Sequence, residues 1–338
     1  MKFKIAVILG DGIGPEITPI ALAIAKKVSD KYSIDIEFNI VEAGDNAYRK
    51  YGEALPKETL EVIRKSHATL KGPVGETAAD VIVKLRQMLN LYANIRPAKS
   101  YPNVPALRRD IDLVIVRENT ECLYKGFEYE VASGIAIAIR VITYRASRRI
   151  AEYAFNLAMK RRRKVVAVHK ANVLRVTCGL FAKACRDVAL NHPEVTYEEQ
   201  YVDACAANLV RRPHEFDVIV TTNMFGDILS DLAAQITGSL GLAPAANIGD
   251  DYAIFEPVHG AAFDIAGKGS ANPIAMILST SMMFKWLGEK YNCEKCIMAS
   301  ENIERAIESV LAKGKVLTPD LGGNAQTKDL ARAIESQL

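Results

Sequence analysis

Two aspartates spaced four residues apart are the side chains of this sequence best suited to metal chemistry. Asp227 and Asp231 follow an apolar run at 218–220 that predicts a buried strand, and the residues from Asn223 onward have the spacing of a helix. On one face of a helix, the two Cβ atoms would lie roughly 5 to 6 Å apart. The pair is suited to a divalent cation, although Asp227 alone would also complement the positive end of the helix dipole.

Three arginines lie near the ends of predicted core elements: Arg86, Arg96 and Arg117. Arg86 is spaced to share a helical face with the apolar residues Ala79, Ile82 and Val83. Buried guanidinium groups are costly unless an anion meets them, and three together suit a di- or tricarboxylate through bidentate pairing. For each arginine alone, an ion pair at the surface is the simpler interpretation.

Two further charged residues follow predicted strands. Lys170 lies just past the apolar run 165–168, with His169 between them, and Asp203 follows the predicted strand 195–202. A lysine at such a position is either a desolvated base with a lowered pKa or a solvated strand end, and the pattern leaves both open. Asp203 adds a third carboxylate at a strand end.

Composition excludes several other classes of protein. The chain has 338 residues, of which 49% are hydrophobic and 25% charged, enough for one large or two medium domains with proper cores. Its 43 Lys and Arg against 40 Asp and Glu leave a formal charge of +3, too even a balance to imply nucleic acid or an anionic membrane as a partner. No apolar run approaches the ~18 residues of a membrane span. We therefore expect a cytoplasmic protein.

Predicted strands and helices alternate along the chain, which favours an α/β architecture. The clearest predicted helices cover about 56–66, 76–90, 146–162, 176–190, 273–288 and 301–313, with a terminal helix from Thr327. The segments 238–242 and 247–250 have the glycine spacing of a loop. Near the start, Gly10, Gly12 and Gly14 form a turn between a strand and a helix, but Pro15 stands where a Rossmann fingerprint needs its third glycine. A Rossmann domain is therefore not predicted.

Several motifs, taken in order, resemble those of the β-decarboxylating dehydrogenases, the family of isocitrate, homoisocitrate and 3-isopropylmalate dehydrogenases. They are Gly10 to Glu16, Leu85-Arg86, Asn94 to Pro97, Arg117 to Glu121, His169 to Asn172, Asn223 to Asp231 and Glu256 to Gly260. The resemblance runs from position 10 to about 325. It implies the family's two-domain α/β fold, with a larger domain of about 1–91 and 238–338 and a smaller, dimer-forming domain over 92–237.

The resemblance also implies roles for the charged residues. Asp227 and Asp231 match ligands of a Mg²⁺ or Mn²⁺ ion, and Asp203 matches a third ligand contributed by the other subunit. Arg86, Arg96 and Arg117 match the residues that bind the substrate carboxylates. Lys170 matches the residue that helps to take the hydroxyl proton, again across the dimer, and Tyr124 matches the acid that protonates the enol. An obligatory homodimer with shared active sites follows from these matches.

The family's cofactor site matches a segment near the C-terminal third of the chain. Asp264 and Ile265 stand where family members that use NADP have a lysine and a tyrosine. A carboxylate there would accept hydrogen bonds from the ribose hydroxyls and repel a 2′-phosphate, so NAD is expected. The matching nucleotide loops include His259 and the segment from Gly260 to Asn272.

The expected reaction is the NAD-dependent oxidation and decarboxylation of a small 2-hydroxy acid. The apolar face of Ala79, Ile82 and Val83 matches the part of the family site that meets the γ-group of the substrate, which favours the isopropyl group of 3-isopropylmalate over a carboxylate. Against this, Arg117 to Glu121 looks more like the isocitrate and homoisocitrate enzymes. Those two activities remain alternatives, and a non-catalytic regulatory subunit of the family is a third.

Overall fold

One ten-stranded sheet runs through the whole molecule in the computed structural model, which describes residues 1–338. Its strands, in spatial order, are β2 (Ile36–Val41), β1 (Phe3–Ile8), β3 (Ala68–Lys71), β12 (Ala253–Pro257), β11 (Pro244–Ile248), β4 (Ala93–Lys99), β5 (Asp112–Glu118), β10 (Val218–Thr221), β8 (Lys164–His169) and β9 (Thr196–Tyr201). The α/β prediction is confirmed.

The middle of the sheet is antiparallel and its two ends are parallel. Strand β11 runs antiparallel to β12 and to β4, and β4 runs antiparallel to β5, while every other neighbouring pair is parallel. Strand β10 lies between two parallel neighbours and is buried throughout, which explains its continuous apolar sequence. The edge strand β2 alternates apolar and polar residues and is only partly buried.

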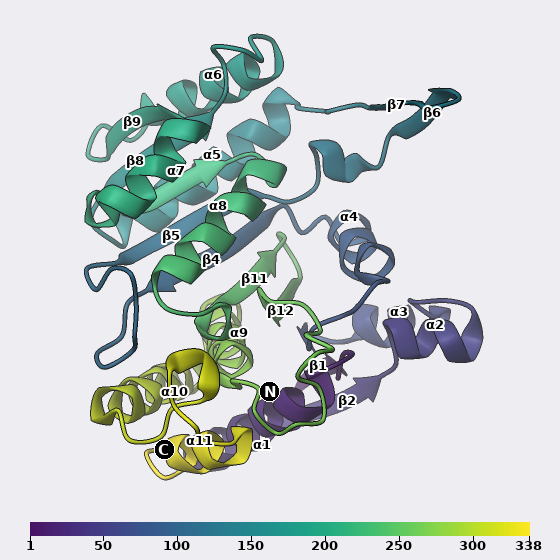
Figure 1. Ribbon diagram of the computed structural model, residues 1–338, viewed down its shortest axis with the longest axis vertical. Coiled ribbons are helices and arrows are strands. Elements are labelled where there is room, and N and C mark those ends of the chain that lie inside the picture. The colour runs from purple at the N-terminus through teal and green to yellow at the C-terminus, as the bar shows by residue number, and fades with distance from the viewer.

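Helices cover the sheet in two lobes (Figure 1). The lobe that holds both chain ends contains α1 (Gly14–Tyr32), α2 (Asp45–Tyr51), α3 (Lys57–Lys65), α9 (Ile274–Tyr291), α10 (Glu294–Lys313) and α11 (Thr327–Glu335). The other lobe contains α5 (Tyr144–Met159), α6 (Thr177–Ala189), α7 (Val202–Arg211) and α8 (Asn223–Ile236). Because one sheet passes through both lobes, the division into 1–91 with 238–338 and 92–237 stays a prediction.

The segment around 238–250 corrects one expectation. Its second half, predicted as loop, contains strand β11. The sequence Pro-Ala-Ala-Asn-Ile has neither alternation nor a β-branched run, so its strand conformation comes from pairing with β12 and β4 on both sides. Helix α10 likewise begins at Glu294 rather than at 301, directly after α9 ends in left-handed Asn292.

The predicted helix over 76–90 is not a regular α-helix. A π-helical turn over Ala79–Val83 precedes the short helix α4 (Lys84–Met88). A π turn holds more residues than an α turn, so the expected face is shifted. Ala79 is exposed, whereas Val81, Ile82 and Leu85 are buried and Val83 is half-buried. The expected apolar face is therefore wrong for Ala79, and Ile82 and Val83 remain as its apolar members.

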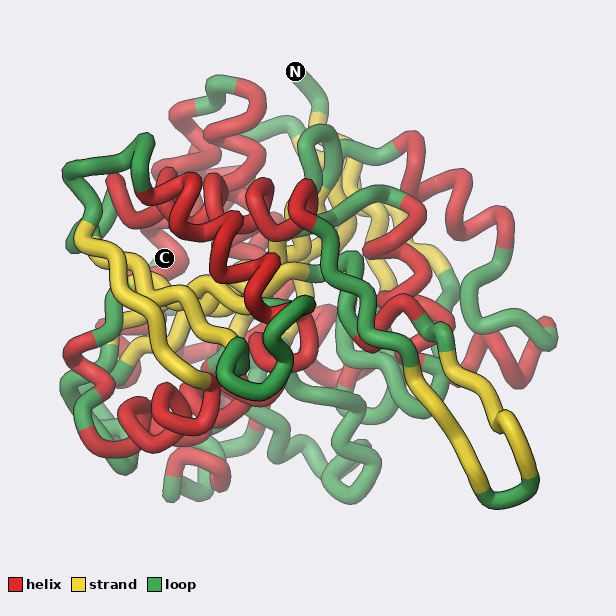
Figure 2. Tube along the Cα trace, turned by 90° about the horizontal axis from the view of Figure 1, so that it is seen from above, coloured by secondary structure: helices red, strands yellow, loops and turns green.

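A two-stranded arm leaves the body of the protein beyond the sheet (Figure 2). Strands β6 (Glu128–Ala132) and β7 (Ile135–Ala138) form this hairpin, and all of their residues are exposed. The apolar side chains Tyr129, Val131 and Ile137 are among those left without cover.

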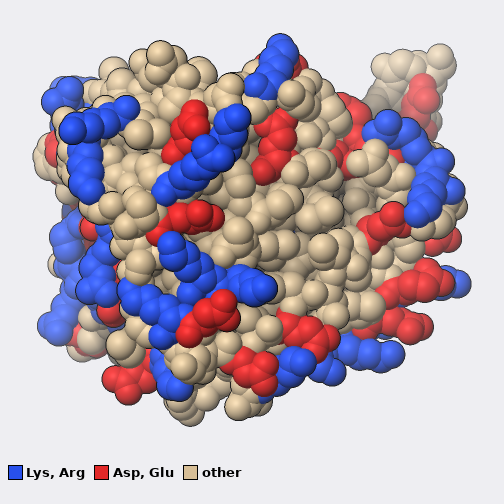
Figure 3. Space-filling model, turned by 90° about the horizontal axis from the view of Figure 1, so that it is seen from below, with Lys and Arg blue, Asp and Glu red and all other residues tan.

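No helix of the molecule combines the length and apolar character needed to cross a membrane. Acidic and basic side chains lie side by side over much of the face in Figure 3.

Candidate active site

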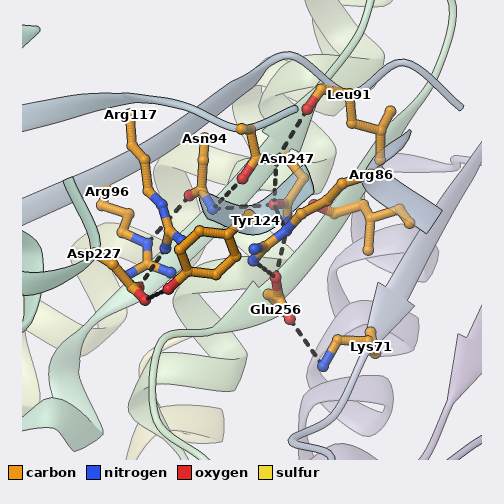
Figure 4. Close-up of polar contacts among 12 residues, drawn as sticks. Lys71, Arg86, Leu91, Asn94, Arg96, Arg117, Tyr124, Asp227, Asn247 and Glu256 are labelled. Atoms are coloured by element: carbon orange, nitrogen blue, oxygen red, sulfur yellow. Dashed lines mark hydrogen bonds and ion pairs between the residues drawn. The ribbon is translucent and has the colours of Figure 1, made fainter. Parts of the chain in front are cut away.

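Two arginines from adjacent strands meet a carboxylate of helix α8 (Figure 4). Arg96 lies on β4 and donates from Nη1 to Asp227 Oδ1 at 3.0 Å and to Ser230 Oγ at 2.7 Å. Arg117, on β5, donates to the same Asp227 oxygen through Nη1 and to Asn223 Oδ1 at 2.8 Å through Nε. The antiparallel pairing of β4 with β5 thus brings together side chains 21 positions apart in the chain.

Arg117 keeps one hydrogen-bond donor unused. Its side chain is 1% exposed, and its Nη2 is buried without a partner. Burial, together with the nearby Arg96 and Arg86, lowers the pKa of Arg117 to about 9, so the guanidinium stays charged at neutral pH. Because a buried unpartnered donor is costly, this nitrogen is suited to an incoming anion such as a substrate carboxylate.

Tyr124 approaches the same carboxylate from the short 3-10 turn Leu123–Lys125. Its hydroxyl donates to Asp227 Oδ2, and its ring faces the Arg117 guanidinium with 4.9 Å between Cζ and the ring centroid. Burial and the hydrogen bond to Asp227 raise the pKa of Tyr124 despite the opposing effect of Arg117. A tyrosine that stays protonated beside a cluster of cations is suited to act as a proton donor.

Asp227 and Asp231 lie on one face of α8, as predicted. Burial alone would raise the pKa of Asp227, but Arg117 and Arg96 lower it overall. Burial raises the pKa of Asp231, whose single partner is Arg96 Nη1 at 3.4 Å. The Asp231 side chain is about half exposed, so its oxygens remain open to a further ligand. Two oxygen donors in this arrangement fit a hard divalent cation, which would also relieve the repulsion between them.

A buried polar network surrounds Arg86 and contains residues that the sequence did not single out. Arg86 Nε donates to Asn247 Oδ1 at 2.9 Å, and its Nη2 donates to Glu256 Oε1 at 3.1 Å. Lys71 Nζ lies 2.8 Å from the other oxygen of Glu256. Asn247 also accepts from Asn94 at 3.0 Å, its register partner on β4. The arginine is therefore fixed between two strands of the antiparallel middle.

Sequence signals for this network exist but are weak. Lys71 ends a wholly buried strand, and a lysine in that place requires a partner. Glu256 and Asn247 lie on the paired strands β12 and β11, and only the register of that pair shows that they meet two cations. The sequence pattern therefore indicates that Lys71 needs a buried partner, but it does not show that this partner is Glu256.

Glu256 provides a test of this network through the pH dependence of stability. Burial would raise its pKa, but Lys71 and Arg86 hold the pKa at about 2 rather than its ordinary 4.5. A lowered pKa stabilises the fold above the unfolded-state value, and this contribution is lost as pH falls from 4.5 toward 2. This lowering of the Glu256 pKa corresponds to a contribution of about 3 kcal/mol to the free energy of unfolding.

We expect Glu256→Gln to lower the free energy of unfolding at pH 7 by about 3 kcal/mol, because two buried cations lose their counterion. Between pH 4.5 and 2, the wild type should lose stability more steeply than the variant. Urea unfolding followed by circular dichroism at several pH values measures both effects. Glu37→Gln, which removes an exposed pair with Lys2, is the control. Equal stability of Glu256→Gln and wild type at pH 7 would contradict the assignment.

Lys170 and Asp203 form a separate pair in the single chain. The Lys170 ammonium, at the end of β8, donates to the Asp203 carboxylate in the first turn of α7. This hydrogen bond lowers the pKa of Asp203. Neither side chain is bonded to Asp227 or to its arginines, and no three acidic, histidine or cysteine side chains of one chain gather around a metal position. The single chain does not complete the expected three-carboxylate site.

The expected cofactor residues lie together in one segment after β12. His259 Nδ1 is 3.0 Å from the Gly260 carbonyl oxygen, while its Nε2 is buried without a partner. Burial lowers the pKa of His259, so the ring is neutral at pH 7. Asp264 is exposed in a turn, with Ile265 half-buried beside it.

Asn272 differs from the other cofactor candidates. Its Nδ2 donates to Asp320 at 3.0 Å, and its Oδ1 accepts from the Ile274 N–H at the start of α9. The side chain is buried and both of its polar atoms are engaged within the protein. In this structure Asn272 therefore holds the start of α9 in place, and its cofactor role stays a prediction.

Comparisons with known proteins identify the family to which this chain belongs. A family model described as isocitrate/isopropylmalate dehydrogenase matches residues 4–334. The chain is 59% identical to 3-isopropylmalate dehydrogenase of Saccharolobus solfataricus over 99% of both chains. It is 57% identical to 3-isopropylmalate dehydrogenase of Sulfurisphaera tokodaii over the full length of both.

A solved structure shows the same fold. The crystal structure of isocitrate dehydrogenase from Methylococcus capsulatus superposes with a TM-score of 0.93 at 43% sequence identity, covering 100% of this chain and 99% of that one. Both the fold and the resemblance inferred from the motifs are confirmed. The chain therefore belongs to the isocitrate/isopropylmalate dehydrogenase family and is an enzyme of that family.

Proposed function

We propose that this protein is an NAD-dependent 3-isopropylmalate dehydrogenase. It would convert (2R,3S)-3-isopropylmalate to 4-methyl-2-oxopentanoate by oxidative decarboxylation, a step of leucine biosynthesis. The observation that carries the proposal is the identity of 57 to 59% with relatives of that name across essentially the entire chain. Every residue that the family chemistry requires is also present, which disfavours a non-catalytic regulatory subunit.

The arrangement of the arginines supports a substrate with two carboxylates. Arg117 offers its unpartnered Nη2, and Arg96 lies beside it on the neighbouring strand. Arg86 has two of its nitrogens fixed by Asn247 and Glu256, which hold the guanidinium in one orientation. Ile82 and half-buried Val83 lie just ahead of Arg86 and would meet the isopropyl group. An apolar group gains ~1 to 3 kcal/mol from such burial.

The two proton transfers are assigned to residues of this chain. A divalent cation held by Asp227 and Asp231 would supply Lewis-acid chemistry at the substrate oxygens, and NAD would serve as the hydride acceptor. Lys170 would take the hydroxyl proton, which requires that its ammonium first give up a proton or pass one to Asp203, its partner. Tyr124, with its raised pKa, would return a proton to the carbon that loses carbon dioxide.

The charge of the nucleotide segment supports NAD. Asp264 is exposed, so its carboxylate is free to accept hydrogen bonds from two ribose hydroxyls. The same carboxylate would repel the 2′-phosphate of NADP. The unpartnered Nε2 of neutral His259 offers a further hydrogen-bonding position in this segment. Mg²⁺ or Mn²⁺ suits the hard oxygen donors of Asp227 and Asp231.

A homodimer would bring Lys170 and Asp203 to the metal of another copy. Within one chain, the side chains of these two residues are hydrogen-bonded to each other, and neither is bonded to the Asp227 group. Apolar side chains beside them and on α8 are left exposed, including Val173, Val176 and Ile228. The exposed hairpin β6–β7 adds a second uncovered apolar surface. A second copy of the chain is the partner that would both cover these surfaces and complete the site.

Substrate choice is tested by measuring NADH formation with three acids in parallel. The acids are 3-isopropylmalate, homoisocitrate and isocitrate, each with Mg²⁺ and with NAD or NADP. We expect kcat/KM for 3-isopropylmalate with NAD to exceed every other combination by at least about tenfold. Higher kcat/KM for isocitrate would overturn the proposal in favour of the activity named for the Methylococcus capsulatus enzyme. A preference for NADP would overturn the assignment of Asp264 alone.

A further inference from the structure

A buried carboxylate lies under the start of helix α2. Asp11 is 1% exposed and has no ion-pair partner. Its oxygens accept from the N–H groups of Asp45 at 2.9 Å, Asn46 at 3.2 Å and Gly75 at 3.1 Å. Gly44, which precedes α2, has no side chain to cap the helix, and a Cβ there would lie 2.4 Å from Asp11 Oδ2. Asp11 therefore caps α2 from another part of the chain.

Asp45, at the start of α2, caps a second helical segment in the same way. Its carboxylate accepts from the N–H of Glu76 at 3.1 Å and from the N–H and hydroxyl of Thr77 at 2.9 and 2.7 Å. Thr77 and its neighbours begin the helical stretch that continues through the π turn to Arg86. Two carboxylates in series thus cap first α2 and then the segment that carries the candidate substrate residues.

The same contact region touches the nucleotide segment. Gly75 lies between Asp45 and Phe263, so close that a Cβ on Gly75 would be 2.1 Å from Asp45 Oδ2 and 2.8 Å from Phe263 Cζ. Phe263 directly precedes Asp264, the residue proposed to bind ribose. Nearby, the N–H of Ile13 donates to the Ala261 carbonyl at 2.8 Å. The start of the helical stretch that leads to Arg86 therefore contacts Asp45 on one side and the nucleotide segment on the other.

We propose that Asp45 is a positioning residue for substrate binding, acting through Glu76 and Thr77 on the placement of Val83 and Arg86. Arg86 is held at its far end by Asn247 and Glu256, and Asp45 holds the beginning of the same helical stretch. Loss of either set of hydrogen bonds would let the helical stretch from Thr77 to Arg86 move relative to Arg96 and Arg117. This proposal rests on the proposed function for the identity of the substrate, but the position of the stretch can be measured without any substrate.

The test compares Asp45→Ala with Asp329→Ala in the full-length protein. Asp329 accepts from the Gln326 N–H in the capping box of the terminal helix α11, so it is a matched capping carboxylate away from the site. We expect Asp45→Ala to raise KM for the preferred acid about tenfold with kcat changed less than about threefold, because the binding geometry is lost but the proton-transfer groups remain. Asp329→Ala should change neither constant.

Hydrogen–deuterium exchange supplies a readout that needs no turnover. Amides of 76–88 should exchange faster in Asp45→Ala than in wild type and in Asp329→Ala. Asp45→Asn keeps one acceptor oxygen and should recover part of both effects, and Thr77→Val, which removes only the hydroxyl donor, should show a smaller change in the same direction. Unchanged exchange over 76–88, or a fall in kcat without a rise in KM, would overturn the proposal. A different preferred acid would overturn only the proposed function.

Discussion

Replacing Asp227 with asparagine is expected to lower kcat by about a thousandfold or more while the α/β fold is retained. Asp227 is the acceptor shared by Arg96, Arg117 and Tyr124, and it is one of the two carboxylates placed for a metal ion. Asparagine keeps the shape and one acceptor oxygen, but it removes the charge that a cation requires. The change therefore removes the metal site and weakens the orientation of the proton donor at the same time.

The metal assignment has a readout that does not depend on activity. Mn²⁺ should raise the Tm of the wild type, because a ligand that binds only the folded state stabilises it, and the Tm of Asp227→Asn should not respond. Asp187→Asn is a matched control, since Asp187 also accepts a tyrosine hydroxyl, that of Tyr144 at 2.7 Å, on helix α6. Retained turnover, or a Mn²⁺ response equal to that of the control, would refute the role of Asp227.

Residues at the ends of strongly patterned elements could be predicted from the sequence. Asp227 follows a continuous apolar strand and opens an apolar-spaced helix, and both elements exist where they were expected. The family resemblance assigned Arg96, Arg117 and Asp227 to one site, but their ion pairs were not predicted, because spacing along the chain says nothing about which strands are neighbours. The register of β4 against β5 decides that contact.

Other features depend on tertiary contacts that leave little trace in the sequence. Strand β11 has no β pattern of its own and exists because two strands flank it. The π turn before α4 shifts the helical face, so that Ala79, expected on the buried apolar face, is exposed, while Val81 is buried. Lys71 and Glu256 meet only because β3 and β12 are adjacent in the sheet. For strand β11 and for the Lys71–Glu256 pair, the deciding interaction joins segments far apart in the chain.

Mixing two inactive variants is expected to restore activity if the sites are shared between subunits. Lys170→Met and Asp227→Asn should each be nearly inactive as homodimers. In a mixed dimer, one site would combine the intact Lys170 and Asp203 of one subunit with the intact Asp227 and Asp231 of the other. With random pairing of equal amounts, half of the dimers are mixed and each has one intact site, so about one quarter of wild-type activity should return.

A second mixture separates this result from nonspecific rescue. Asp227→Asn and Asp231→Asn both alter helix α8, so every site of their mixed dimer contains a damaged carboxylate pair and activity should stay at the level of the single variants. Co-expression with two affinity tags isolates the mixed dimers, in which one of the two sites is intact, so NADH formation with 3-isopropylmalate should reach about half of the wild-type level for the first pair of variants. If Lys170 instead served the Asp227 of its own chain, the first mixture would be as inactive as the second. Because the Lys170–Asp203 pair is not bonded to the Asp227 group within one chain, we expect the two mixtures to differ.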